Sequence, residues 1–232
     1  MPLFFGDPYF FLAIIGLIIS LLAQLNVSAT FARYKRLATY AGLTGGEVAR
    51  RLLHEKGIYD VVVEETPFHL GDHYDPSAKV LRLSPEVYRG TSIAALGVAA
   101  HEVGHAIQHH EGYVPLNLRA AVYPIVNIGS HLYFPLILLG FIFRSLNLIY
   151  LGIFAFLAIL LFQLITLPVE FNASRRALAL LEGGGYLVGE EMAGARRVLQ
   201  AAALTYVAAV AVSMLELFRL LAIAGLFGRR DD

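Results

Sequence analysis

Residues 93–108 read IAALGVAAHEVGHAIQ, and the interpretation of the whole chain follows from this stretch. Small apolar residues surround two histidines and a glutamate, and Thr91-Ser92 in front of them is a typical helix N-cap. We predict a single helix that is packed on most sides and presents one polar face. Because residues four positions apart lie on the same face of a helix, His101 and His105 are expected to point in the same direction.

That polar face carries the pattern H-E-x-x-H, with His101, Glu102 and His105 at its defined positions. Two imidazoles one helical turn apart can reach one Zn²⁺ at about 2.0–2.1 Å, and Glu102 is offset toward the water that the ion activates. Zinc lowers the pKa of such a water from about 15.7 to about 7, so Glu102 is predicted to take its proton and pass it to the leaving amine. In the alternative interpretation the two histidines only pack inside the protein, which would bury polar groups without partners.

A catalytic zinc keeps three protein ligands and an open position, so one more ligand is needed. His109 and His110 lie too close in sequence to the two histidines to swing back easily. Glu170 is the better choice, because it follows Pro168 and is predicted to open a new helix, EFNASRRALALLE. Alternatively, Glu170 only stabilises the N-terminus of that helix through the helix dipole.

The segment before the zinc helix predicts a small α+β arrangement. Thr44-Gly-Gly-Glu47 is a capping box that opens a short helix. Tyr59–Glu65 and Lys79–Leu83 are rich in β-branched or alternating residues and are predicted to be two strands, separated by a turn over residues 71–76. A Ser-Pro pair directly after the second strand predicts a brief helical turn.

Several polar residues are weaker candidates for contacts to a substrate or a transition state. Lys79–Leu83, which includes Arg82, is either an edge strand that holds a substrate backbone by strand addition or an ordinary strand. His73 and Tyr74 are candidates for donating to an oxyanion, although a histidine in a turn is more often only solvated. Arg175 is a candidate for orienting Glu170 or for binding a substrate carbonyl, but a juxtamembrane arginine is usually a topological anchor.

Composition identifies the chain as a membrane protein. Of its 232 residues 57% are hydrophobic and 16% are charged, with a mean hydropathy of +0.64, whereas soluble domains are about 45–50% apolar and about 25% charged. Stretches with few or no charges predict four transmembrane helices. The predicted spans are residues 8–29, 120–143, 145–169 and 200–226. Glu216 and Arg219 interrupt the last of them, so in an alternative interpretation this span ends near Met214 and an interfacial helix follows.

The basic residues predict the orientation of these spans. Arg33, Lys35 and Arg36 follow the first span, and Arg175 and Arg176 follow the third, whereas the tip between the second and third spans has little positive charge. Because positive charge accumulates on the cytoplasmic side, the polar segments are both expected in the cytoplasm. These two segments, residues 33–119 and 170–197, would together form the catalytic domain.

The remaining composition excludes several functional classes. Cysteine is absent, which excludes disulfides, iron–sulfur clusters and thiol nucleophiles, so that any metal must be held by histidine and carboxylate. Eighteen basic residues balance eighteen acidic residues without a basic run, so a nucleic-acid partner is not expected.

Three stretches of the chain, in this order, resemble a known family: GDHYDPSAKVLRLSPEVY, SIAALGVAAHEVGHAIQHHEGYVPLNLRAA and LPVEFNASRRAL. They are similar to the YugP-type neutral zinc metallopeptidases of bacterial membranes, and the resemblance covers nearly the whole chain. It implies a multi-pass membrane metallopeptidase with His101, His105 and Glu170 as zinc ligands and Glu102 as catalytic acid and base. The layout is also similar to that of the HtpX/Ste24-like proteases, an analogy that suggests a role in membrane protein quality control.

The sequence therefore predicts a membrane α-helical protein of about four transmembrane helices with a small α+β zincin-like catalytic domain. We expect a Zn²⁺ metalloendopeptidase of the bacterial plasma membrane. Its expected substrates are polypeptides, including membrane proteins. The sequence leaves open whether the protein forms an oligomer or binds a regulatory membrane partner. One alternative is a zinc-containing scaffold or adaptor, but such a protein has no need of a general base at Glu102. Another is an intramembrane protease, which is disfavoured because the zinc helix lies in a segment with ten basic and ten acidic residues.

Overall fold

A computed structural model describes residues 9–69 and 71–228 of the chain. It divides the chain into two compact units. Of the described residues, the first unit contains 9–24, Leu118–Leu167 and 205–228, and the second contains Leu25–Asn117 and Pro168–Leu204. The predicted start of the first span at residue 8 lies outside the described residues.

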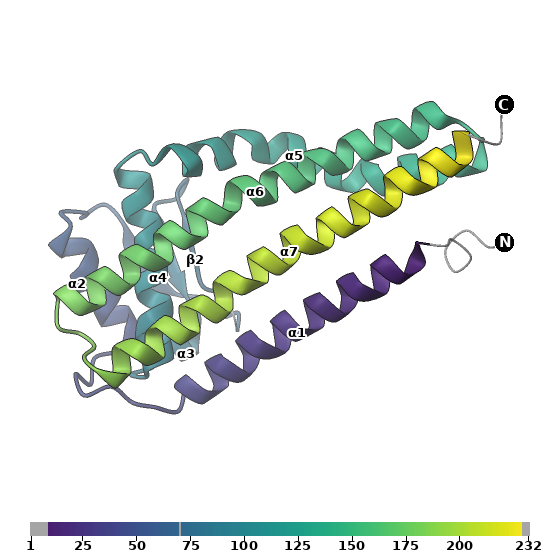
Figure 1. Cartoon of the computed structure of the whole chain (residues 1–232). Helices are drawn as coiled ribbons and strands as arrows, with labels where there is room; N and C mark the ends of the chain where they lie inside the picture. The colour runs from purple at the N-terminus through teal and green to yellow at the C-terminus, as the bar shows by residue number, and fades with distance from the viewer. Residues whose placement is uncertain (1–8, 70, 229–232) are drawn as a thin grey trace. The chain divides into compact units, whose positions relative to one another are not determined.

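Four long helices dominate the fold (Figure 1). They are α1 (Phe10–Tyr34), α5 (Val114–Ile142), α6 (Leu146–Gly183) and α7 (Glu190–Gly228). Each is long and apolar enough to cross a bilayer, and within residues 9–69 and 71–228 they are the four candidate spans. The expected number of transmembrane helices agrees with this result, whereas the limits of the spans within the helices stay predictions.

The helices run further than the predicted spans. Much of the predicted polar segment 170–197 is itself helical, because α6 continues through it to Gly183 and α7 already begins at Glu190. Pro168 lies inside α6 rather than at its end. The prediction that a new helix opens at Glu170 was therefore wrong, and this residue lies in the interior of a continuous helix.

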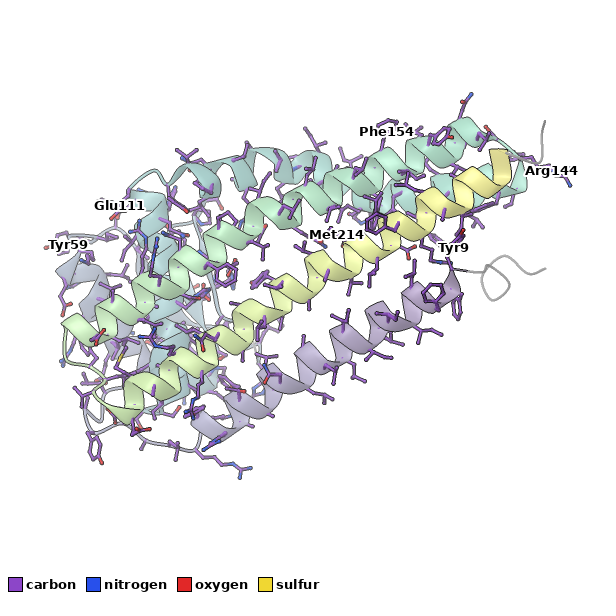
Figure 2. The ribbon with its side chains drawn as sticks, in the orientation of Figure 1. Tyr9, Tyr59, Glu111, Arg144, Phe154 and Met214 are labelled. Atoms are coloured by element: carbon purple, nitrogen blue, oxygen red, sulfur yellow. The ribbon has the colours of Figure 1, made fainter. Side chains whose placement is uncertain are left out.

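The first unit has an aliphatic core and an apolar exterior. Buried side chains of α5, α6 and α7 pack together in it, and they are Ile137, Ile149, Ile153, Phe156, Leu220 and Ala224. Other large apolar side chains face outward, such as Phe154 on α6, which is 68% exposed (Figure 2). An exterior of this kind is suited to lipid and not to water.

The second unit contains a small mixed sheet of three strands. These are β1 (Val62–Glu65), β2 (His73–Asp75) and β3 (Val80–Leu83), in the order β1-β3-β2. β3 pairs in parallel with β1 and antiparallel with β2. The predicted turn over residues 71–76 therefore contains a strand, and β3 is the central strand. Of the two interpretations of Lys79–Leu83, the edge strand is excluded because β3 is paired on both sides, and the ordinary strand agrees with the structure.

Three further helices complete the second unit: α2 (Gly45–Glu55), α3 (Pro85–Tyr88) and α4 (Ile93–His110). The predicted capping box at Thr44 is confirmed, as is the proline at the start of α3. α4 is buried along most of its length and contributes more side chains to the core than any other element of this unit. The helix with the H-E-x-x-H pattern is thus a central element of the unit (Figure 1).

Candidate metal centre

Helix α4 carries both histidines and the glutamate of the motif. Its first turn is capped by Ser92, whose Oγ accepts a hydrogen bond of 3.2 Å from the backbone N–H of Ala95. Alanine and glycine fill most of the positions around the motif, so neighbouring elements approach the helix closely. Both Glu102 and His105 are only 8% exposed.

Helix α6 approaches α4 at one point of very close contact. A Cβ atom added to Gly104 would lie 2.7 Å from the carbonyl oxygen of Ala173, which is closer than real Cβ atoms come to a backbone oxygen. Glycine is therefore required where the two helices meet. Since Gly104 directly precedes His105, and Ala173 lies one turn after Glu170, this contact brings the carboxylate of α6 to the histidines of α4.

Three side chains converge at this contact. The Nε2 atom of His101 lies 3.2 Å from Glu170 Oε2, and the Nε2 atom of His105 lies 3.6 Å from the same oxygen. The three ligand atoms lie within 4.8 Å of one another, and they form the group that could hold a metal ion among residues 9–69 and 71–228. Two imidazoles and one carboxylate are a donor set typical of catalytic zinc.

The other nitrogen of each imidazole has its own partner. Nδ1 of His105 lies 3.0 Å from Gln108 Oε1, and Nδ1 of His101 lies 3.1 Å from Ser174 Oγ. Partners of this kind fix the ring orientation and the tautomer of a metal-binding histidine. Both Nε2 atoms are consequently the ones that face the carboxylate and would bind the metal.

Gln108 determines the tautomer of His105. Its Nε2 donates to the backbone carbonyl of Val169 at 2.8 Å and to Asn172 Oδ1 at 3.0 Å. Because the amide nitrogen of Gln108 donates to both of these acceptors, Oε1 is the amide atom that faces His105, and an amide oxygen can only accept a hydrogen bond. His105 Nδ1 must therefore carry the proton, which leaves the lone pair on Nε2 for a metal.

The hydrogen-bond network continues to the surface through an arginine. Arg176 donates from Nε to Asn172 Oδ1 at 2.7 Å and forms an ion pair with Glu111 at 2.7 Å. Asn172 thus accepts from both Gln108 and Arg176, which holds it in place from two directions. The network connects α4 and α6 on the side of His105.

The electrostatic environment of the histidines is negative. Burial by itself lowers the pKa of His105, but the contact with the Glu170 carboxylate and the charge of Glu102 outweigh burial and raise this pKa above its ordinary value. Two carboxylates therefore favour positive charge between the helices. A dication is a better match for this environment than a neutral ligand.

Glu102 lies close enough for its charge to act on His105, but it does not belong to the group of three candidate ligands. It follows His101 in α4, so it projects about 100° around the helix from that residue. Within the described residues its carboxylate has no hydrogen-bond partner. A buried carboxylate without such a partner is available to take and return a proton.

The structure separates the four weaker candidates. Tyr74 lies on the inner face of the sheet, and its hydroxyl forms a 2.8 Å hydrogen bond with Nδ1 of His109 on α4. Burial, helped by two nearby aspartates, raises the pKa of Tyr74 to about 12, so its phenol keeps its proton and can donate. By contrast, His73 and Arg82 pair on the opposite face of the sheet, and Arg175 is exposed on α6. The structure brings none of these three into the group of ligands.

Sequence reasoning missed the residues that orient His105. Gln108 is seven positions after His101 and therefore on the same face of α4 as the ligands. This spacing is the feature of the sequence that could have identified Gln108. The roles of Asn172 and Arg176 depend on how α6 packs against α4, and no pattern in the sequence indicates that packing.

We expect Gln108→Leu to lower zinc affinity by about 10–100-fold, the usual effect of losing an outer partner of a metal-binding histidine. The variant removes the acceptor for His105 but retains all three ligands. Competition with a fluorescent chelator measures the dissociation constant. The matched control is Gln163→Leu, because Gln163 lies on α6 and its Oε1 has no hydrogen-bond partner within the described part of the chain. Equal zinc affinity in wild type and Gln108→Leu would contradict the orienting role.

Comparisons with known proteins agree with this donor set. The sequence model of the family described as "Putative neutral zinc metallopeptidase" matches residues 9–225. The chain is also 50% identical over 211 residues to "Putative membrane protease YugP" of Bacillus subtilis (strain 168), covering 91% of this chain and 94% of that protein. No solved structure matches the chain. The match extends over nearly the whole chain, and the chain therefore belongs to the neutral zinc metallopeptidase family.

Proposed function

We propose that the protein is an integral membrane zinc metalloendopeptidase. The observation that carries the proposal is the convergence of His101, His105 and Glu170 on one point beside Glu102. Membership in a zinc metallopeptidase family and similarity to a membrane protease support it. Four helices long and apolar enough to cross a bilayer support the membrane assignment.

The donor set fits zinc, and three protein ligands leave a coordination position open for catalysis. A bound Zn²⁺ supplies Lewis-acid activation of water. The chain supplies the proton transfers: the Glu102 carboxylate accepts a proton from the attacking water and then donates it to the nitrogen of the leaving amine. Gln108 and Ser174 hold the two imidazoles in position throughout.

The substrate backbone requires a place near this centre. Because β3 is paired on both sides, a peptide cannot add to it, and the open edges of the sheet belong to β1 and β2. β2 is the better candidate, since its Tyr74 contacts α4 directly. We therefore infer that an extended polypeptide pairs along β2 and that unfolded segments of membrane proteins are the substrates. Their removal would serve membrane protein quality control.

Removal of the metal is the direct test of this function. We expect 1,10-phenanthroline to abolish cleavage of an unstructured polypeptide by the detergent-purified protein, and we expect added Zn²⁺ to restore it. The isomer 1,7-phenanthroline, which does not chelate, is the matched control and should have no effect. Cleavage that persists after complete removal of zinc would refute the proposal.

The orientation in the membrane is a separate prediction. Because the three ligands must share one side, and the basic residues favour the cytoplasm, a reporter that is active only outside the cytoplasm should be silent after Leu83 and after Glu182. The same reporter after Arg144, in the connection between α5 and α6, should be active. Activity after both Leu83 and Glu182 would reverse the orientation. Activity after only one of them would contradict a shared metal centre.

A further inference from the structure

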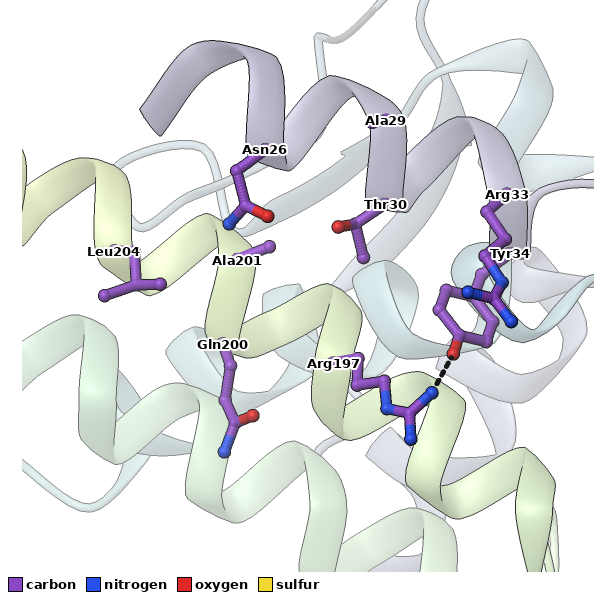
Figure 3. A pocket seen from close by; sticks show the side chains of 9 residues that line it. All are labelled: Asn26, Ala29, Thr30, Arg33, Tyr34, Arg197, Gln200, Ala201 and Leu204. Carbon is purple, nitrogen blue, oxygen red and sulfur yellow. Dashed lines mark hydrogen bonds between the residues drawn. The ribbon is translucent and has the colours of Figure 1, made fainter. Parts of the chain in front are cut away.

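A second polar site lies in the same unit, in a pocket between α1 and α7 (Figure 3). Its volume is about 390 Å³. The lining residues are Asn26, Ala29, Thr30, Arg33, Tyr34, Arg197, Gln200, Ala201 and Leu204. None of them belongs to the candidate metal centre, and neither the family description nor the name of the relative assigns the pocket a role.

Two arginines meet around one tyrosine in this pocket. Arg197 donates to the hydroxyl of Tyr34 at 3.1 Å, and the guanidinium carbon of Arg33 lies 5.6 Å from the centre of the Tyr34 ring. Tyr34 is buried and packs tightly on α7, because a Cβ atom added to Gly194 would lie 2.7 Å from its ring. The tyrosine is thus a fixed support for both guanidinium groups.

These two positive charges have no acidic partner in the part of the chain that the structure describes. Within residues 9–69 and 71–228 neither Arg33 nor Arg197 forms an ion pair with a carboxylate, and no acidic residue lines the pocket. Two neighbouring guanidinium groups repel each other unless an anion lies between them. Guanidinium groups bind phosphate oxygens well because two N–H groups can donate side by side.

One end of the pocket carries both charges, and the other end combines the amide of Asn26 with the aliphatic side chain of Leu204 (Figure 3). Figure 3 shows Arg33, Tyr34 and Arg197 toward one end, and Asn26 and Leu204 toward the other. In the sequence, Arg33 is the first charge after the stretch that begins beyond Asp7, and Arg197 is the last charge before the stretch that ends at Glu216. Both arginines therefore mark the level at which the apolar parts of their helices begin, where lipid phosphates lie.

We propose that this pocket binds a phosphate oxyanion and that its source is the headgroup of an anionic phospholipid. The phosphate lies between Arg33 and Arg197. The neutral polar side chains Asn26, Thr30 and Gln200 face the glycerol backbone and the headgroup hydroxyls. The acyl chains start beside Leu204. Free phosphate compounds share the charged part of this chemistry but would gain nothing from the aliphatic side chain of Leu204.

The test measures lipid binding by native mass spectrometry of the detergent-purified, zinc-loaded protein. Phosphatidylglycerol and phosphatidylcholine are titrated separately, and inorganic phosphate and glycerol 3-phosphate are added as competitors. The variant Arg33→Gln/Arg197→Gln removes the pocket charges. The variant Arg36→Gln/Arg196→Gln removes the same number of charges from adjacent positions outside the pocket and is its matched control.

We expect the wild type and the control variant to bind phosphatidylglycerol at least tenfold more tightly than phosphatidylcholine. The Arg33→Gln/Arg197→Gln variant should bind phosphatidylglycerol about 10–100-fold more weakly, while its zinc content stays unchanged. A second variant, Ala29→Phe, fills the pocket and keeps both arginines, and it should also lose the lipid.

Three results would overturn the proposal. Equal loss of lipid in both arginine variants would show that general surface charge attracts the lipid and that the pocket does not bind it. Displacement of phosphatidylglycerol by millimolar inorganic phosphate or glycerol 3-phosphate would assign the pocket to a soluble phosphate compound. Unchanged lipid affinity in Ala29→Phe would likewise place the lipid elsewhere.

Discussion

Replacing Glu102 with glutamine should abolish peptide-bond hydrolysis while zinc remains bound at close to one ion per chain. The amide retains the size of the side chain and its place in α4, and the three ligand atoms do not include Glu102. What the variant loses is the carboxylate that accepts and returns the proton. General acid–base catalysis contributes about 10²–10⁴-fold to the rate, and we expect a loss at or above the upper end of this range.

The assay is cleavage of an unstructured, membrane-tethered polypeptide in detergent, with zinc measured by mass spectrometry on the same samples. Glu64→Gln is the matched control, because Glu64 makes an ion pair with Arg82 on the outer face of the sheet. This control should keep full activity. Comparable cleavage by wild type and Glu102→Gln would refute the mechanism. A zinc-loaded wild type that cleaves no polypeptide would favour the scaffold function over the protease.

Replacing Glu170 with alanine should reduce bound zinc well below one ion per chain. This change removes one of three protein ligands and leaves two imidazoles without the carboxylate that both of them contact. A catalytic zinc site needs three protein ligands, and two neutral histidines supply neither the third ligand nor the negative charge of the carboxylate. Activity should fall together with the zinc content, unlike in Glu102→Gln.

Zinc content after dialysis against a weak chelator measures this loss. Glu182→Ala is the matched control, because it removes an exposed carboxylate from the same helix. It should keep its zinc. A Glu170→Ala variant with full zinc occupancy would exclude Glu170 as a ligand and would direct attention to His109, one turn beyond His105.

The candidate ligands could be predicted because their signals are local or chemically specific. His101 and His105 require only the spacing of one helical turn. Glu170 was chosen because it follows Pro168 beyond the third predicted span, and the chain has no cysteine that could serve as a ligand instead. The grouping of these three side chains agrees with that prediction. Their roles as ligands stay predictions until zinc is measured.

What sequence reasoning could not supply depends on tertiary packing. Pro168 suggested the end of one helix and the start of another, yet α6 continues through it, since a proline within a long helix can be accommodated when the surrounding structure supports the freed backbone groups. The central position of β3 depends on pairing between distant residues, and β2 is only three residues long. Gln108 acts through contacts with α6 that no local pattern encodes.

The close contact between Gly104 and Ala173 has a thermodynamic consequence. The three candidate ligands come from helices that are adjacent in space and more than sixty residues apart in the chain, so an unfolded chain does not present them together. Zinc held by these three residues would bind the native state preferentially, and its binding free energy would be added to that of folding. At a free zinc concentration 1,000-fold above the dissociation constant, this linkage amounts to about 4.1 kcal/mol. An ion that activates water would thus also act as a clamp between two helices, and a cell that withholds zinc would lower the lifetime of the protein as well as its activity.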